Sequence, residues 1–119
     1  MAKYDVVDVT FVRDHLFTLK KIDVRPRSYV EKYGFVPGAV NIEWEPVKEA
    51  GGDVPENWKK KCEYYGYEPG EEIIVYCHDG ILTKQASEAL AEAGYRRIKA
   101  YVGSFSDWMS YPEDPIEKL

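Results

Sequence analysis

Residues 73–76 read Ile-Ile-Val-Tyr, a run of four β-favouring side chains with no polar alternation. Side chains along a strand point alternately to its two faces, so a run of this kind needs cover on both faces. Pro69-Gly70 marks a turn before the run, and a helix-favouring stretch follows it after Gly80. The sequence therefore predicts a buried central strand of a parallel sheet, with helices packed on both sides.

The rest of the chain alternates between strand-favouring and helix-favouring segments. Strands are expected over residues 6–9, 19–24, 39–42 and 97–101, and helices over 11–16, 27–33, 56–65, 82–93 and 104–111. This order predicts a three-layer α/β/α fold with a central, mostly parallel sheet and right-handed crossovers. A length of 119 residues fits one domain, so we expect a single domain over residues 1–119.

Cys77 stands at the end of the predicted central strand, just before a loop that contains Gly80 and leads into a helix. In open parallel sheets the ligand site lies beyond the carboxyl ends of the strands. Successive loop N–H groups and a helix N-terminus both favour negative charge, and hence a reactive thiolate. The alternative is a buried, inert cysteine that ends a strand. The local pattern alone leaves both interpretations open.

Charge and cysteine content narrow the classes of partner. The formal net charge is −5, and the densest cationic run, Lys59-Lys60-Lys61, is followed at once by Cys62 and Glu63. Nucleic acid and an anionic membrane are therefore poor partners, and no apolar run is long enough for a membrane span. With only two cysteines and no signal-peptide pattern, we expect a cytoplasmic protein with reduced thiols.

Four segments, in order along the chain, resemble motifs of the rhodanese (sulfurtransferase) family. They are Ile22-Asp23-Val24-Arg25, the turn Gly-Phe-Val-Pro-Gly-Ala-Val-Asn-Ile at residues 34–42, Ile74-Val75-Tyr76-Cys77 with Gly80, and Tyr-Val-Gly-Ser-Phe-Ser-Asp-Trp at residues 101–108. The last of these is similar to a segment of thiosulfate and 3-mercaptopyruvate sulfurtransferases. From the first to the last, they span residues 22–108, which is most of the chain.

The resemblance implies a rhodanese-like fold and a sulfurtransferase without a cofactor. Cys77 would take sulfane sulfur from thiosulfate, or a related donor such as 3-mercaptopyruvate, and pass it to a thiophilic acceptor such as cyanide, a thiol or an acceptor protein. Backbone N–H groups of residues 79–82 would hold the persulfide. The expected site loop and its neighbours are His78, Asp79, Gly80, Ile81, Leu82, Thr83 and Ser104.

Asp23 and Arg25 match a supporting pair of the family, with two interpretations. They act as an acid and a base, or they form a structural ion pair, which we favour. His78 also has two interpretations, because it either stabilises the thiolate or projects into solvent. Cys62 shares one predicted helix face with Trp58 and Tyr65 and is expected in the core.

The sequence departs from the thiosulfate enzymes at the loop. Those enzymes follow the cysteine with Arg and Lys, whereas this chain has His78 and Asp79. The departure favours an alternative function, a persulfide carrier or regulatory binding module with little turnover. A cysteine-dependent phosphatase or arsenate reductase would need Arg six positions after the cysteine, where Thr83 stands, and the His and Cys residues have no metal-site spacing. The sequence leaves the oligomeric state open.

Overall fold

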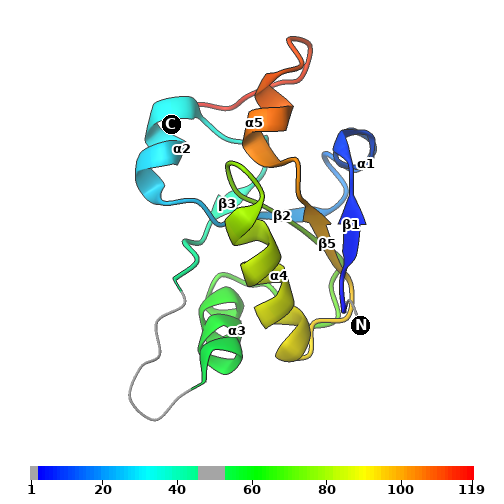
Figure 1. The fold of residues 1–119 in the computed structure, drawn as a ribbon, viewed down its shortest axis with the longest axis vertical. Coiled ribbons are helices and arrows are strands. Elements are labelled where there is room, and N and C mark those ends of the chain that lie inside the picture. The colour runs from blue at the N-terminus through cyan, green and yellow to red at the C-terminus, as the bar shows by residue number, and fades with distance from the viewer. Residues whose placement is uncertain (1–2, 46–52) are drawn as a thin grey trace.

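The computed structural model describes residues 3–45 and 53–119. Five strands form one sheet in the order β1-β5-β4-β2-β3, and every neighbouring pair is parallel (Figure 1). In chain order the elements are β1 (Asp5–Val7), α1 (Val9–Asp14), β2 (Lys20–Asp23), α2 (Arg27–Tyr33), β3 (Val40–Asn41), α3 (Val54–Tyr64), β4 (Ile73–Tyr76), α4 (Ile81–Glu92), β5 (Ile98–Tyr101) and α5 (Ser104–Met109).

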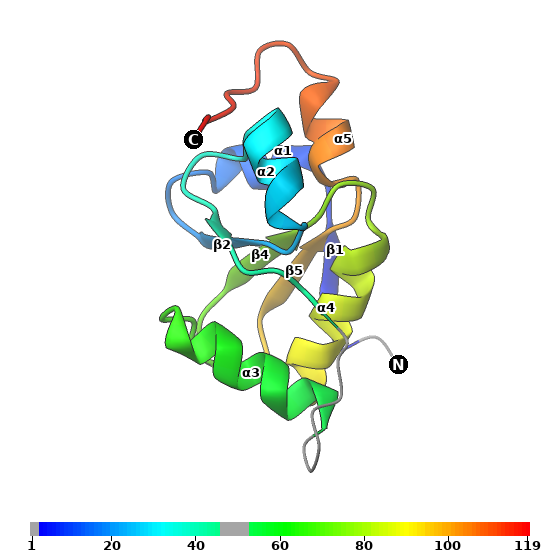
Figure 2. The ribbon, with the colours of Figure 1, turned by 90° about the vertical axis from the view of Figure 1, so that its left-hand side faces the viewer.

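Helices cover both faces of this sheet, which confirms the predicted three-layer α/β/α architecture. Figure 2 shows α3 and α4 on one side and α1, α2 and α5 on the other. Alternate side chains of β4 pack into two separate hydrophobic clusters, one on each face of the sheet. Ile73 and Val75 pack in one cluster with side chains of α3 and α4, whereas Ile74 and Tyr76 pack with side chains of α1 and α5. All four β4 side chains are buried, as the unbroken apolar run predicted.

Several local predictions were wrong. The strand predicted over residues 6–9 ends at Val7, and Val9 is helical. Helix α1 begins at Val9 rather than at residue 11, because the Asp8 side chain caps it and accepts a hydrogen bond from Phe11 N at 3.1 Å. Tyr65 is 48% exposed, although it was expected in the core beside Trp58 and Cys62. Helix α3 ends at Tyr64, and the chain then turns at Gly66 with φ +90°, so Tyr67 fills the buried position instead.

The C-terminal segment folds back over the turn between α2 and β3. Phe35 and Glu117 form an antiparallel bridge, and Lys118 Nζ donates to Tyr33 O at 3.1 Å. This segment therefore braces the helix that borders Cys77. No helix in residues 3–45 or 53–119 combines the length and apolar character that crossing a membrane requires.

Candidate active site

Cys77 lies at the carboxyl end of β4, the central strand, where its side chain is 1% exposed. Two backbone N–H groups point at its sulfur: Gly80 N lies 3.1 Å and Thr83 N lies 3.3 Å from Cys77 Sγ. One comes from the loop and the other from the first turn of α4. Both donors favour negative charge on the sulfur, and the N-terminus of α4 adds to their effect.

Gly80 is the residue that lets the loop curl around this sulfur. It has φ +97°, a left-handed conformation that glycine adopts at little cost. A Cβ at this position would lie 2.3 Å from Val102 O, closer than any side chain can approach. Glycine is thus required twice here, for the backbone angle and for the close passage under the β5–α5 connection.

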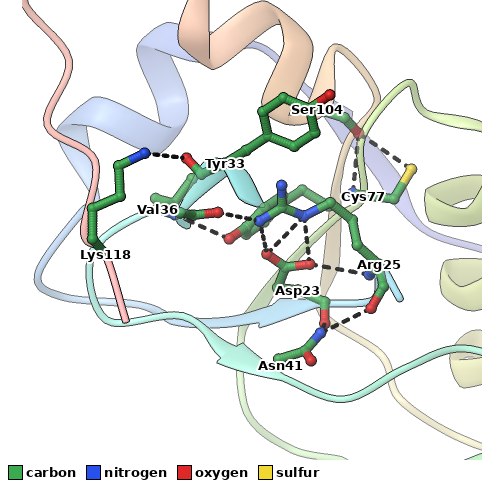
Figure 3. A network of polar contacts seen from close by, with 10 residues as sticks. Asp23, Arg25, Tyr33, Val36, Asn41, Cys77, Ser104 and Lys118 are labelled. Carbon is green, nitrogen blue, oxygen red and sulfur yellow. Dashed lines mark hydrogen bonds and ion pairs between the residues drawn. The ribbon is translucent and has the colours of Figure 1, made fainter. Parts of the chain in front are cut away.

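Ser104 connects the ends of β4, β5 and α4 beside the sulfur (Figure 3). Its Oγ donates to Tyr101 O at 2.9 Å and accepts from Cys77 N at 3.2 Å. It also lies 3.0 Å from Thr83 Oγ1 and 3.6 Å from Cys77 Sγ. Since Tyr101 O takes its only proton, Ser104 acts here as an acceptor. Its φ of +61° is strained for a non-glycine residue, and strain of this kind is concentrated at functional sites.

Asp23 and Arg25 form a buried ion pair after β2, with Arg25 Nη2 2.6 Å from Asp23 Oδ2. Arg25 Nε donates to both carboxylate oxygens at 3.0 Å, and Nη2 also donates to Gly34 O at 2.6 Å (Figure 3). The guanidinium stacks 4.2 Å above the Phe105 ring. These contacts tie the strand end to the α2–β3 turn, which is the geometry of a structural ion pair.

A pocket of about 240 Å³ opens beside the cysteine. Its lining residues come from the β2–α2 connection, from α2 and from the loop and first turn of α4. They are Arg25, Pro26, Tyr29, Cys77, His78, Asp79, Ile81 and Leu82. Four of the predicted site residues therefore line one opening with Cys77, namely His78, Asp79, Ile81 and Leu82, whereas Gly80, Thr83 and Ser104 are not among the lining residues.

The interpretation that His78 projects into solvent is wrong, whereas its role in stabilising the thiolate stays a prediction. Its ring packs against two tyrosines of α2, with centroids 5.2 Å from the Tyr29 ring and 5.3 Å from the Tyr33 ring. Its Nδ1 is buried and has no hydrogen-bond partner among the described residues. Neither tyrosine was among the predicted site residues, and Tyr29 also lines the pocket. Their spacing of four places them on one helix face, but the sequence does not reveal that this face borders the loop.

The persulfide cradle expected from residues 79–82 differs in its donors. Asp79 is exposed and its Oδ1 accepts from Ile81 N at 3.1 Å, so this N–H is already occupied. The same oxygen lies 4.0 Å from Cys77 Sγ. Of the predicted donors, Gly80 N reaches the Cys77 sulfur, and Thr83 N, which lies outside the predicted range, reaches it as well. Leu82 and Ile81 contribute to the apolar side of the pocket.

Cys62 has a very different setting. It is 0% exposed in the core between α3 and the sheet, and burial raises the pKa of its thiol to about 12. It is a core residue, as predicted. Within residues 3–45 and 53–119, no three His, Cys, Asp or Glu side chains come together as a metal site would require.

The family model of the rhodanese-like domain matches residues 9–111, which is most of the sequence. The chain belongs to the rhodanese-like domain family. Among curated proteins, it is 36% identical over 95 residues to a thiosulfate sulfurtransferase of Pseudomonas aeruginosa and 34% identical over 91 residues to one of Azotobacter vinelandii. Each match covers 72% of this chain and 32% of the relative.

The rhodanese-like domain therefore spans about a third of the length of these relatives. A solved structure of a human single-domain sulfurtransferase has a similar fold, with a TM-score of 0.70 and 22% identity over 88% of this chain and 95% of that chain. The predicted rhodanese-like fold is confirmed by the family match and by this similarity together with the parallel sheet.

Proposed function

We propose that this rhodanese-like domain is a sulfurtransferase that carries sulfane sulfur as a persulfide on Cys77. The observation that carries the proposal is the pair of backbone N–H groups, from Gly80 and Thr83, that converge on Cys77 Sγ at the edge of a pocket. They stabilise the thiolate that attacks and the anion that results. The names of the relatives, thiosulfate sulfurtransferases, support the same reaction class.

The reaction has two steps. With thiosulfate as donor, the Cys77 thiolate attacks the outer sulfur, a new S–S bond forms, and sulfite leaves with the electron pair of the broken S–S bond. A nucleophilic acceptor such as cyanide, a thiol or a thiol on a partner protein then attacks the terminal sulfur. The Cys77 thiolate is regenerated as leaving group. The first step needs Cys77 as a free thiolate, and the cytoplasmic location that we propose would keep this thiol reduced.

A second candidate is a persulfide carrier or regulatory binding module with negligible turnover. Asp79 favours it, because a carboxylate oxygen 4.0 Å from the sulfur opposes the approach of a dianionic donor. A turnover assay with thiosulfate and cyanide separates the two candidates. The sulfurtransferase forms thiocyanate over many cycles, whereas a carrier stops after one equivalent.

The same assay on two cysteine variants tests the assigned nucleophile. Cys77→Ser should abolish turnover with the fold retained, since serine is close to cysteine in size. Cys62→Ser is the matched control, and its activity should remain close to that of the wild type. Equal activity of the Cys77→Ser variant and the wild type would refute the mechanism.

A further inference from the structure

The charge of the Cys77 pocket points to a class of sulfur acceptor, and this inference rests on the proposed function. Arg25 is the only cationic side chain among the lining residues of this pocket. It is 0% exposed and paired with Asp23, so the pair presents no net charge to the opening. Arg27 and Lys84, the cations that most closely follow Pro26 and Leu82 in sequence, do not line the pocket.

Asp79 therefore dominates the charge at the opening. It is exposed, and Ile81 N fixes its carboxylate through Oδ1, which lies 4.0 Å from the sulfur. An incoming thiolate is itself an anion and meets an anionic persulfide. Each additional negative charge on the acceptor raises the repulsion, and a positive charge on it reduces the repulsion.

The remaining wall of the pocket is apolar or aromatic. Ile81 is 62% exposed and Tyr29 is 40% exposed at the opening, and Pro26 and Leu82 lie beside them. Such a surface suits the carbon chain of an organic molecule better than a strongly hydrated inorganic anion. We propose that the acceptor of the Cys77 sulfur is a small organic thiol that carries an ammonium group.

In this step the acceptor sulfur attacks the terminal sulfur of the Cys77 persulfide. One S–S bond forms between acceptor and terminal sulfur, and the bond between terminal sulfur and Sγ breaks. The electron pair of the broken bond stays on Sγ as thiolate, and the proton of the acceptor thiol passes to solvent. The acceptor leaves as an organic persulfide, with no external oxidant or reductant.

The test is a single-turnover discharge of protein whose Cys77 persulfide has been confirmed by mass spectrometry. The probes are cysteamine, 2-mercaptoethanol and 3-mercaptopropionate, which have a positive, neutral and negative substituent, respectively. Asp79→Asn removes the charge but keeps an oxygen for Ile81 N. Glu88→Gln on α4, exposed and outside this pocket, is the matched control. The ratio of wild-type to variant rate for one thiol cancels the intrinsic nucleophilicity of that thiol.

For Asp79→Asn, we expect discharge by cysteamine to slow about 5-fold and discharge by 3-mercaptopropionate to quicken by a similar factor, both less so at high salt. The rate with 2-mercaptoethanol should change little, and Glu88→Gln should leave all three unchanged. Equal ratios for the three thiols, or a loaded protein that no thiol discharges, would overturn the inference alone. Failure of Cys77 to load with any donor would instead refute the proposed function.

Discussion

Replacing Gly80 by alanine should damage the site far more than an equivalent change elsewhere. At φ +97° an L-residue costs about 1–2 kcal/mol. The new Cβ would also lie 2.3 Å from Val102 O, and since that atom is backbone, the loop must shift. Overpacking of this kind costs about 1–3 kcal/mol more. Gly80→Ala should therefore lower the free energy of unfolding by about 2–5 kcal/mol, and the shifted loop should move Gly80 N away from Cys77 Sγ.

Gly94→Ala is the matched control, because Gly94 has φ +106° and nothing lies within 4 Å of the Cβ it would gain. In that variant the free energy of unfolding should fall only by the backbone cost of about 1–2 kcal/mol. The assays are urea unfolding and the rate of iodoacetamide alkylation of Cys77, read at each cysteine by mass spectrometry. Gly80→Ala should slow alkylation at mildly acidic pH, whereas Gly94→Ala should not. Equal destabilisation with unchanged alkylation in both variants would refute the assigned role of Gly80.

Three further predictions concern two side chains at the site and two in the core. Ser104→Ala removes the buried acceptor of Cys77 N and should lower the free energy of unfolding, measured in urea, by about 1–3 kcal/mol. Alkylation of Cys77 should also be slower. A free energy of unfolding and an alkylation rate equal to those of the wild type would contradict this role. Asp79→Lys should improve the apparent affinity for thiosulfate, measured by turnover kinetics, and this gain should shrink as the salt concentration rises. A neutral or harmful effect at low salt would mean that this side chain points away from the donor. Burial raises the pKa of both Cys62 and Tyr67 to about 12, so the unfolded chain loses these protons before the folded chain does as pH rises. The free energy of unfolding should therefore fall between about pH 9 and pH 12. A flat pH profile of urea unfolding, or an unchanged slope of that profile in Cys62→Ser, would contradict this reason.

Much of the fold follows from the sequence because single segments contain its signals. The apolar run of β4 requires cover on both faces, and this fixes a parallel sheet between helices. The position of Cys77 at the end of that strand, with a glycine in the next loop, is equally local. These features depend on neighbours in the chain, so periodicity and turn residues are enough to find them.

Contacts between distant segments could not be predicted in the same way. Helix α2 places Tyr29 and Tyr33 against His78, and only the packed structure shows that these rings meet. Gly80 lies close to Val102 O, which belongs to the short connection between β5 and α5, and only the packed structure shows this contact. For the same reason, the sequence did not reveal that Thr83 N reaches the sulfur while Asp79 occupies Ile81 N.

Peptide mass spectrometry tests directly whether Cys77 carries sulfane sulfur. The protein is incubated with thiosulfate and, in parallel, with 3-mercaptopyruvate, and its free thiols are then blocked before digestion. We expect the peptide containing Cys77 to gain the mass of one sulfur atom, which a reducing thiol removes, and the peptide containing Cys62 to stay unchanged. Sulfur on Cys62 alone, or on neither cysteine with either donor, would contradict this expectation.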